Sequence, residues 1–245
     1  MAKIRHLTPP GFKRLTLDGG RVAYSPNTAV RDVHTLFLKD AGPIEYHDPG
    51  LDIIGHTRRG HHYYFKTDLK SAFDYVTYER LHAVVDGLGI DLRLLEPRDH
   101  FFHEQGEGGL IQGAPASPYL FEIYCRFGGL DFELGQYCEA AGLHCTRYVD
   151  DVLLSSDKRI GKRVGPSVRR VVGRYGFVLN DSKTKRVNTL EEPLEVLGYE
   201  IRGTRIDPKT KTMQKLYSSG YDADQRWSIR AWRKQVRRLN KKARE

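Results

Sequence analysis

The chain has 245 residues, of which 39% are apolar, and a formal net charge of +9 with a pI near 9.4. This length suffices for one sizeable core or two small ones, and the positive charge indicates an anionic partner, most simply nucleic acid. We expect no membrane association, because no apolar run could span a bilayer and the N-terminal residues lack an apolar signal segment. The three cysteines, Cys125, Cys138 and Cys145, form no C-x-x-C pair and predict reduced thiols in a cytoplasmic protein.

The first half of the chain alternates between strand and helix patterns. Residues 12–26 predict a hairpin, and residues 28–38 predict a short helix with one apolar face. Residues 63–69 are rich in aromatic side chains and predict a strand that ends at Asp68, where a lone aspartate is ordinarily a cap. Residues 78–88 carry an apolar stripe at helical spacing and predict a second helix.

A glycine- and proline-rich segment follows at residues 108–118, which read Gly-Gly-Leu-Ile-Gln-Gly-Ala-Pro-Ala-Ser-Pro. This composition excludes a regular element until Ser117-Pro118, which predicts a helix start with Ser117 as the N-cap and proline in the first turn. Such a loop lets the backbone approach a ligand closely and directs a helix N-terminus at it. A purely structural turn is the alternative interpretation.

The acidic pair at Asp150-Asp151 lies within residues 147–154, Arg-Tyr-Val-Asp-Asp-Val-Leu-Leu. Apolar residues on both sides of the pair predict a β-hairpin whose tip carries the two acids. Two adjacent carboxylates without a counter-ion are costly, so a divalent metal is their natural partner. Aspartate is also a common turn residue, and a solvated turn is the alternative.

The last third of the chain ends in a strongly basic segment. Residues 162–175 predict an amphipathic helix, and residues 196–201 predict a strand that turns back at 202–204. Residues 225–243 have apolar side chains at steps of three and four, which predicts a helix with a packing seam. Residues 210–245 hold 11 Lys and Arg against 3 Asp and Glu, which is nearly the whole charge excess. A solvated basic helix is the alternative to a nucleic-acid contact.

Five motifs, taken in order, resemble the reverse transcriptases, specifically their bacterial group II intron-like, retron-like and defence-associated branch in a small form. The resemblance covers roughly residues 12–204. The motifs are a strand-terminal acid with an aromatic residue five positions later, a Gln-Gly-x-x-x-Ser-Pro loop, a Tyr-x-Asp-Asp tip, an Asn with a downstream Lys-Thr pair, and a Leu-Gly-Tyr turn: Asp68 and Phe73, Gln112-Gly113 with Ser117-Pro118, Tyr148-Val149-Asp150-Asp151, Asn180 with Lys183-Thr184, and Leu197-Gly198-Tyr199.

The resemblance implies an α+β fold: a right-hand polymerase palm, in which helices back an antiparallel sheet, with abbreviated fingers and a short helical thumb. Residues 1–204 would form the fingers and palm, and residues 205–245 the short basic thumb. In this family the thumb follows the primer–template duplex, so binding should depend steeply on salt. Primer or template binding is accordingly expected of three tail residues, Arg230, Arg233 and Arg237.

Nucleotidyl transfer requires two divalent ions, about 4 Å apart, which activate the primer hydroxyl and hold the triphosphate. Mg²⁺ prefers oxygen ligands and retains waters, so two or three carboxylates plus substrate phosphates suffice, and Mn²⁺ is an expected substitute. We expect Asp68 and Asp150 to bridge the ions and Asp151 to complete the acidic cluster. The backbone carbonyl of Leu69 is a further candidate ligand.

The resemblance also assigns residues around the incoming nucleotide. Phe73 resembles the aromatic steric gate that collides with a ribose 2′-hydroxyl and so selects dNTPs. Gln112 and Gly113 would lie along the nucleotide. Arg21, in an Arg-x-x-x-x-Pro pattern, resembles a fingers residue that contacts the triphosphate.

Further assignments concern the leaving group and the primer. Lys183 resembles the catalytic lysine that protonates pyrophosphate, and Lys185 is the alternative for that role. Tyr148 and Val149 would lie against the primer end. The turn that resembles the primer grip comprises Leu197, Gly198 and Tyr199.

The expected function is therefore an RNA-directed DNA polymerase that uses dNTPs, an RNA template and a dedicated non-coding RNA, with a role in antiphage defence. Untemplated or protein-primed DNA synthesis at the same site is one alternative, and a non-catalytic RNA-binding subunit is another. RNA synthesis is disfavoured by Phe73. Short fingers and thumb leave room for a partner protein or for a second copy of the chain.

Overall fold

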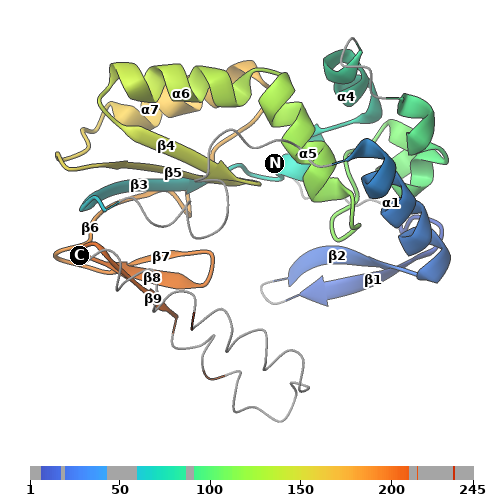
Figure 1. Ribbon diagram of the computed structural model, residues 1–245, viewed down its shortest axis with the longest axis horizontal. Coiled ribbons are helices and arrows are strands. Elements are labelled where there is room, and N and C mark those ends of the chain that lie inside the picture. Colours follow the sequence, from blue (N-terminus) through green and yellow to red (C-terminus); the bar gives the residue numbers. More distant parts are fainter. Residues whose placement is uncertain are drawn as a thin grey trace. The chain divides into compact units, whose positions relative to one another are not determined.

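The computed structural model describes residues 7–17, 20–42, 60–86 and 91–209, together with the isolated positions 214 and 234 (Figure 1). The chain forms two compact units, and each is assembled from three stretches of sequence. The first unit takes its residues from 1–45, 69–134 and 168–179. The second takes its residues from 46–68, 135–167 and 180–245.

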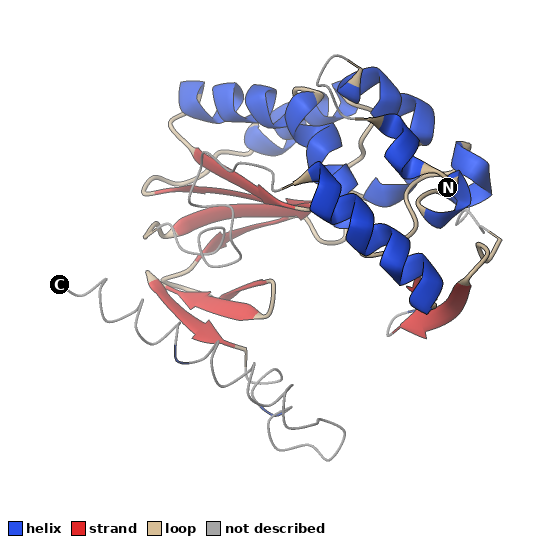
Figure 2. Ribbon diagram, turned by 45° about the vertical axis from the view of Figure 1, so that its right-hand side comes forward, coloured by secondary structure: helices blue, strands red, loops and turns tan. Residues whose placement is uncertain are grey.

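The first unit contains a two-stranded hairpin and several helices, which are blue in Figure 2. Its first helix begins where it does because the Asn27 side chain caps it, accepting a hydrogen bond from the Val30 N–H at 2.9 Å. A cluster of Tyr24, Ile111 and Ala114 packs the 108–118 loop onto the hairpin. The elements are β1 (Phe12–Leu17), β2 (Arg21–Pro26), α1 (Thr28–Ala41), α3 (Ala72–Tyr75), α4 (Tyr78–Val85), η2 (Leu92–Leu95), η3 (Arg98–His100), η4 (His103–Gly106) and α5 (Ser117–Phe127).

The second unit is built on two antiparallel sheets. The larger sheet has the strand order β4-β5-β3-β6, and the smaller is the meander β7-β8-β9. Helices α6 (Leu130–Ala140) and α7 (Val164–Arg174) contribute residues to both units. The strands are β3 (Tyr63–Asp68), β4 (His144–Tyr148), β5 (Asp151–Ser156), β6 (Lys185–Asn188), β7 (Leu194–Val196), β8 (Tyr199–Arg202) and β9 (Arg205–Pro208).

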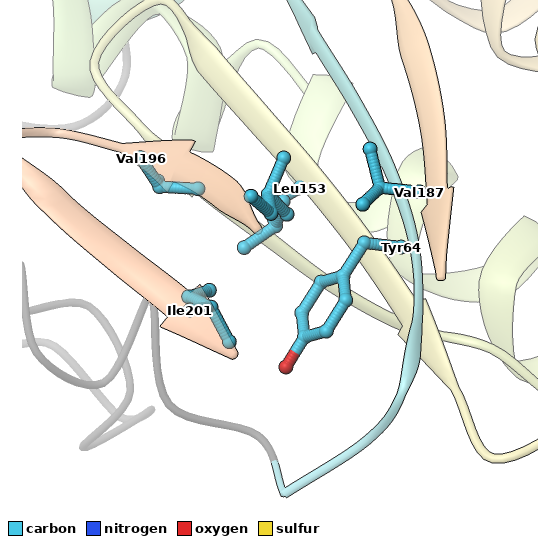
Figure 3. Close-up of a cluster of buried hydrophobic side chains, with 6 residues drawn as sticks. Tyr64, Leu153, Val187, Val196 and Ile201 are labelled. Atoms are coloured by element: carbon cyan, nitrogen blue, oxygen red, sulfur yellow. The ribbon is translucent and has the colours of Figure 1, made fainter. Parts of the chain in front are cut away.

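The meander covers one face of the larger sheet. Tyr64, Leu153 and Val187 project from three adjacent strands of the larger sheet into one buried cluster (Figure 3). The meander supplies the other buried members of the cluster, Leu194, Val196 and Ile201. Because side chains two residues apart on a strand share a face, Lys66 and Asp68 lie on the same face as Tyr64.

Most elements predicted from the sequence are confirmed, including the α+β class, the first hairpin and the helices at 28–38, 78–88 and 162–175. The predicted N-cap role of Ser117 is wrong: Ser117 is the first helical residue, and its hydroxyl donates to the Ile111 carbonyl at 2.7 Å. None of the described helices is long and apolar enough to cross a membrane.

The predicted turn at residues 202–204 is confirmed, but the predicted strand before it is not continuous through residues 196–201. Leu197 and Gly198 form a two-residue turn between β7 and β8, with φ of 47° and 84°. Two positive φ values in a two-residue hairpin loop match a type I′ turn, whose twist suits the flanking strands. The chain then turns again after Arg202, and β9 pairs with β8 across the predicted domain boundary at residue 204.

Candidate active site

Three carboxylates gather at one end of the larger sheet. Strands β3 and β5 pair so that Asp68 lies directly opposite Asp151. Directly opposed residues of an antiparallel pair have Cα atoms about 4.5–5.5 Å apart, with both side chains on one face. Asp150 belongs to the two-residue loop between β4 and β5, where Tyr148 pairs with Asp151. The predicted hairpin is thus confirmed, and the register brings together acids that are 83 positions apart in the sequence.

The site is largely buried, and its charges interact. Asp68 is 5% exposed and Asp151 is 9% exposed. Burial raises the pKa of Asp151, the Lys66 ammonium opposes this, and the negative charges of Asp150 and Asp68 raise the pKa further. A carboxylate whose pKa is raised by its own burial and by neighbours of the same sign is stabilised in its charged form by a bound cation.

Two lysines lie against these carboxylates. Lys183 Nζ is 2.7 Å from Asp68 Oδ2, and its side chain is 55% exposed. Lys66 Nζ is 3.5 Å from Asp151 Oδ1, and its side chain is only 17% exposed. The other oxygen of Asp68, Oδ1, is buried and has no hydrogen-bond partner. Such an atom costs about 1–3 kcal/mol unless something binds it.

These residues fit a hard divalent cation. In the part of the chain that the structure describes, no group of three or more His, Cys, Asp or Glu side chains is placed to hold a metal ion. Mg²⁺ does not need such a group, because it retains waters and binds through one or two carboxylates plus substrate phosphates. Such carboxylates would come from among Asp68, with its unpaired Oδ1, Asp150 and Asp151. Leu69 follows Asp68 directly and is 1% exposed.

The tip of the acidic hairpin is strained. Val149 has φ of 54°, which is a genuine outlier for a β-branched residue and costs on the order of 1–3 kcal/mol. The Arg147 side chain, 3% exposed, donates from Nη1 to the Val149 carbonyl at 2.8 Å. The backbone conformation that presents Asp150 is therefore held by the strand residue that precedes Tyr148.

Lys183 owes its position to a network of hydroxyl groups. The Thr184 hydroxyl donates to the Asn180 carbonyl at 2.8 Å, so the Thr67 hydroxyl donates to Thr184 Oγ1 at 2.6 Å. Lys183 N–H also donates to the Asn180 carbonyl. Of the two lysines considered for the same role, Lys183 contacts Asp68, whereas Lys185 is exposed on β6.

The residues expected around the nucleotide lie in the first unit. The Leu110 N–H donates to the Phe73 carbonyl at 2.9 Å, and the Gln112 carbonyl accepts from the Tyr24 N–H at 2.7 Å. Gly113, with φ of 100°, fits tightly, because a Cβ there would lie 2.5 Å from the Tyr24 carbonyl oxygen. The loop that carries Gln112 and Gly113 is thus fixed between β2 and the segment that carries Phe73.

Other predicted residues are placed as follows. The Phe73 ring is half-buried and lies 5.2 Å, centroid to centroid, from Phe121. Arg21 is exposed at the start of β2. Tyr199 is buried in β8, directly after the Leu197-Gly198 turn. The predicted thumb residues Arg230, Arg233 and Arg237 lie outside the described residues.

A family model described as "Reverse transcriptase (RNA-dependent DNA polymerase)" matches residues 19–201. The chain belongs to the reverse transcriptase family. A stretch of 77 residues is 36% identical to the retron Ec86 reverse transcriptase of Escherichia coli. This stretch covers 31% of this chain and 23% of the retron protein. The predicted family is confirmed.

Solved structures agree on the fold of this reverse transcriptase. An apo telomerase from Candida tropicalis, truncated from its C-terminal domain, has a TM-score of 0.51 at 16% identity, over 82% of this chain and 55% of that one. A second apo telomerase structure from this organism has a TM-score of 0.52 at 15% identity, over 85% and 49%. The palm-type α+β fold is therefore confirmed. The chain spans about half the length of these telomerase chains and 23% of the retron enzyme.

The sequence interpretation of this reverse transcriptase missed two residues that hold the site, Lys66 and Arg147, and one that holds the first unit, His34. Lys66 and Arg147 were not distinguished from ordinary charged strand residues, although each contacts the carboxylate hairpin. His34 is fully buried on α1, and its ring nitrogens bond the Ala116 N–H and the His100 carbonyl. The only available signal was a charged residue within an otherwise buried strand.

Proposed function

We propose that this reverse transcriptase is an RNA-directed DNA polymerase that extends a primer with dNTPs. The register that sets Asp68 opposite Asp151, with Asp150 in the connecting turn, carries the proposal. When bound, two divalent ions, Mg²⁺ or Mn²⁺, would supply activation of the primer hydroxyl and neutralise charge on the triphosphate. The name of the retron relative and the family description support RNA as the template.

The chain's own residues divide the remaining work. The three carboxylates hold and orient the reacting groups, and the buried setting strengthens each electrostatic contact because water is largely excluded. Lys183 presents an ammonium 2.7 Å from Asp68 on an exposed side chain. From this position it protonates the leaving pyrophosphate as phosphate replaces Asp68 as its partner.

Selection of the sugar is assigned to Phe73, and contact with the nucleotide to Gln112 and Gly113. Support comes from the contacts that fix the backbone of these residues against Leu110 and Tyr24. Replacing Phe73 with alanine should raise incorporation of rNTPs relative to dNTPs. Unchanged sugar discrimination would remove Phe73 from this role.

The proposal extends to the partners. The primer end would contact Tyr148 and Val149, and the duplex would reach the Leu197-Gly198-Tyr199 turn and the basic tail. The tail's charge supports a nucleic-acid contact. A dedicated non-coding RNA, a role in antiphage defence and a cytoplasmic location complete the proposal. The three cysteines, none of which forms a disulfide, support a reducing compartment.

The test uses the purified chain with a poly(rA) template, an oligo(dT) primer, dTTP and Mg²⁺. Asp150→Asn should lower the rate of extension by at least two orders of magnitude, since it removes a carboxylate without changing shape. Asp157→Asn is the matched control, because Asp157 is exposed at the far end of β5 and should be replaceable without loss.

Three other outcomes would each replace the proposal. Synthesis that ignores the template would indicate untemplated polymerisation. Label that remains covalently attached to the protein would indicate protein priming. RNA binding without synthesis, or more than a tenth of wild-type activity in Asp150→Asn, would indicate a non-catalytic subunit or a different site.

A further inference from the structure

Lys66 occupies an unusual position for a lysine. It lies on β3 two residues before Asp68, so both side chains project from the same face of the sheet. Its partner across the sheet is Leu153 on β5, two residues after Asp151. Lys66 therefore stands between the acidic end of the sheet and the buried cluster around Tyr64 and Leu153.

The ammonium of Lys66 makes two contacts. One joins Nζ to Asp151 Oδ1 at 3.5 Å, and the other is a hydrogen bond of 3.1 Å to the backbone carbonyl of Glu195. Glu195 is the middle residue of β7, which is an edge strand of the meander. The ammonium thus connects a catalytic carboxylate to the neighbouring sheet.

The connection continues to the turn that resembles the primer grip. The Glu195 carboxylate forms an ion pair with Lys209 Nζ. The Lys209 N–H donates to the Gly198 carbonyl at 2.9 Å. An unbroken series of polar contacts therefore runs from Asp151 through Lys66, Glu195 and Lys209 to the turn between β7 and β8.

We propose that Lys66 is a positioning residue that holds Asp151 and the Leu197-Gly198 turn in one fixed geometry and serves as the permanent counter-ion of the acidic site. This assignment rests on the proposed polymerase function for the meaning of the turn. The counter-ion role does not depend on that function, because it rests on the charges of Lys66 and Asp151.

The two lysines at the site differ in the way this assignment requires. Lys183 is 55% exposed and has one carboxylate partner, so its contact with Asp68 can be given up at small cost when a cation arrives. Lys66 is 17% exposed and is held at two points. Removing a partly buried charge that is held at two points leaves its partner carboxylate uncompensated. Lys66 therefore remains beside Asp151 when the site is loaded, and it limits the net negative charge presented to the metal.

Two variants separate the two parts of this role in the full chain. Lys66→Met keeps the aliphatic stem but removes the charge, so Mn²⁺ should bind more tightly, with a dissociation constant lower by about tenfold. Mn²⁺ binding is measured without substrates, by the rise in melting temperature on titration with MnCl₂ or by the free Mn²⁺ signal in electron paramagnetic resonance. Lys66→Arg retains the charge and should retain the wild-type Mn²⁺ affinity.

Glu195→Gln breaks the ion pair with Lys209 but leaves the backbone carbonyl that Lys66 uses. It should leave Mn²⁺ affinity unchanged and raise KM for primer–template about threefold or more, at unchanged KM for dTTP. Lys158→Met is the matched control, because Lys158 is an exposed lysine in the loop after β5. It should change neither quantity.

The outcomes are distinguishable. A purely structural lysine would lower the melting temperature of Lys66→Met without strengthening Mn²⁺ binding, and that result overturns the counter-ion role. Wild-type KM for primer–template in Glu195→Gln overturns the link to the turn. If the wild-type chain synthesises no DNA at all, the proposed function fails, while the Mn²⁺ titrations still decide the charge assignment of Lys66. Should Lys66→Met not fold, Mn²⁺ binding by Lys66→Gln decides the same question.

Discussion

Acidification should destabilise this protein through His34, a buried residue of helix α1 in the first unit. Burial lowers the pKa of His34 from 6.5 to about 4, partly opposed by the hydrogen bond to the His100 carbonyl, which raises it. The Ala116 N–H donates to Nδ1 at 3.3 Å, so the proton of the neutral ring is on Nε2, which donates to His100 at 2.9 Å. Protonation of Nδ1 would break the first of these bonds.

The sign and the magnitude follow from linkage. Because the folded pKa is depressed, the unfolded chain binds more protons between pH 6.5 and 4, and stability falls as pH falls through this window. Between pH 7 and pH 4.5, His34 should reduce the free energy of unfolding by roughly 2–3 kcal/mol. The contribution is fully present above pH 6.5.

Urea unfolding of the wild type and of His34→Gln at pH 7 and pH 4.5 measures this effect. Glutamine can donate and accept hydrogen bonds at the same points but does not titrate in this range. The free energies of unfolding of the two proteins should therefore converge by roughly 2–3 kcal/mol at the lower pH, in line with about 1.4 kcal/mol for each pKa unit. His82→Gln, at an exposed position on α4, is the control and should follow the wild type. Parallel losses in wild type and His34→Gln would refute the reasoning.

Three further changes test other parts of the molecule. Gly109→Ala would place a Cβ 2.2 Å from the Phe73 carbonyl oxygen. It should lower the free energy of unfolding in urea by about 1–3 kcal/mol and reduce discrimination against rNTPs. Gly135→Ala, in open space on α6, is the control and should not destabilise the protein. Arg147→Met frees the strained Val149 carbonyl and should lower kcat about tenfold or more in steady-state extension, at nearly unchanged KM for dTTP. In the tail, the slope of log K for primer–template against log salt should fall by roughly 2–3 when glutamine replaces Arg230, Arg233 and Arg237.

The sequence was sufficient for the acidic hairpin because each part of its signal is local. Apolar residues flank Asp150 and Asp151. The aromatic-rich segment at residues 63–69 predicts a strand that ends at its acidic residue, Asp68. The meeting of Asp68 with Asp151 is not local, since it depends on the register of two strands that are far apart in sequence. The motif order of a known family supplied that information.

The supporting residues were beyond sequence reasoning for the same reason. From the sequence alone, Lys66 would be interpreted as a solvated side chain on a strand. Only the structure shows that β7 lies against the face of the sheet from which Lys66 projects. The sequence predicts Leu197 within a strand, because leucine is apolar and rarely adopts a positive φ. In the sequence, His34 is one polar residue on a predicted helix. Only the structure shows that the 108–118 loop packs against its ring and buries it.

The acidic end of the larger sheet is destabilising, and the residues around it offset that effect. Three acids converge there, Asp68 Oδ1 has no partner, and Val149 is held at positive φ. The unpaired oxygen and the strained turn each cost on the order of 1–3 kcal/mol in isolation. Directly behind them, the same strands contribute Tyr64 and Leu153, which are 1% exposed, to the cluster shared with the meander. Burial of each such side chain stabilises the fold by about 1.5–3 kcal/mol, so two side chains on adjacent strands offset the unpaired oxygen and the strained turn.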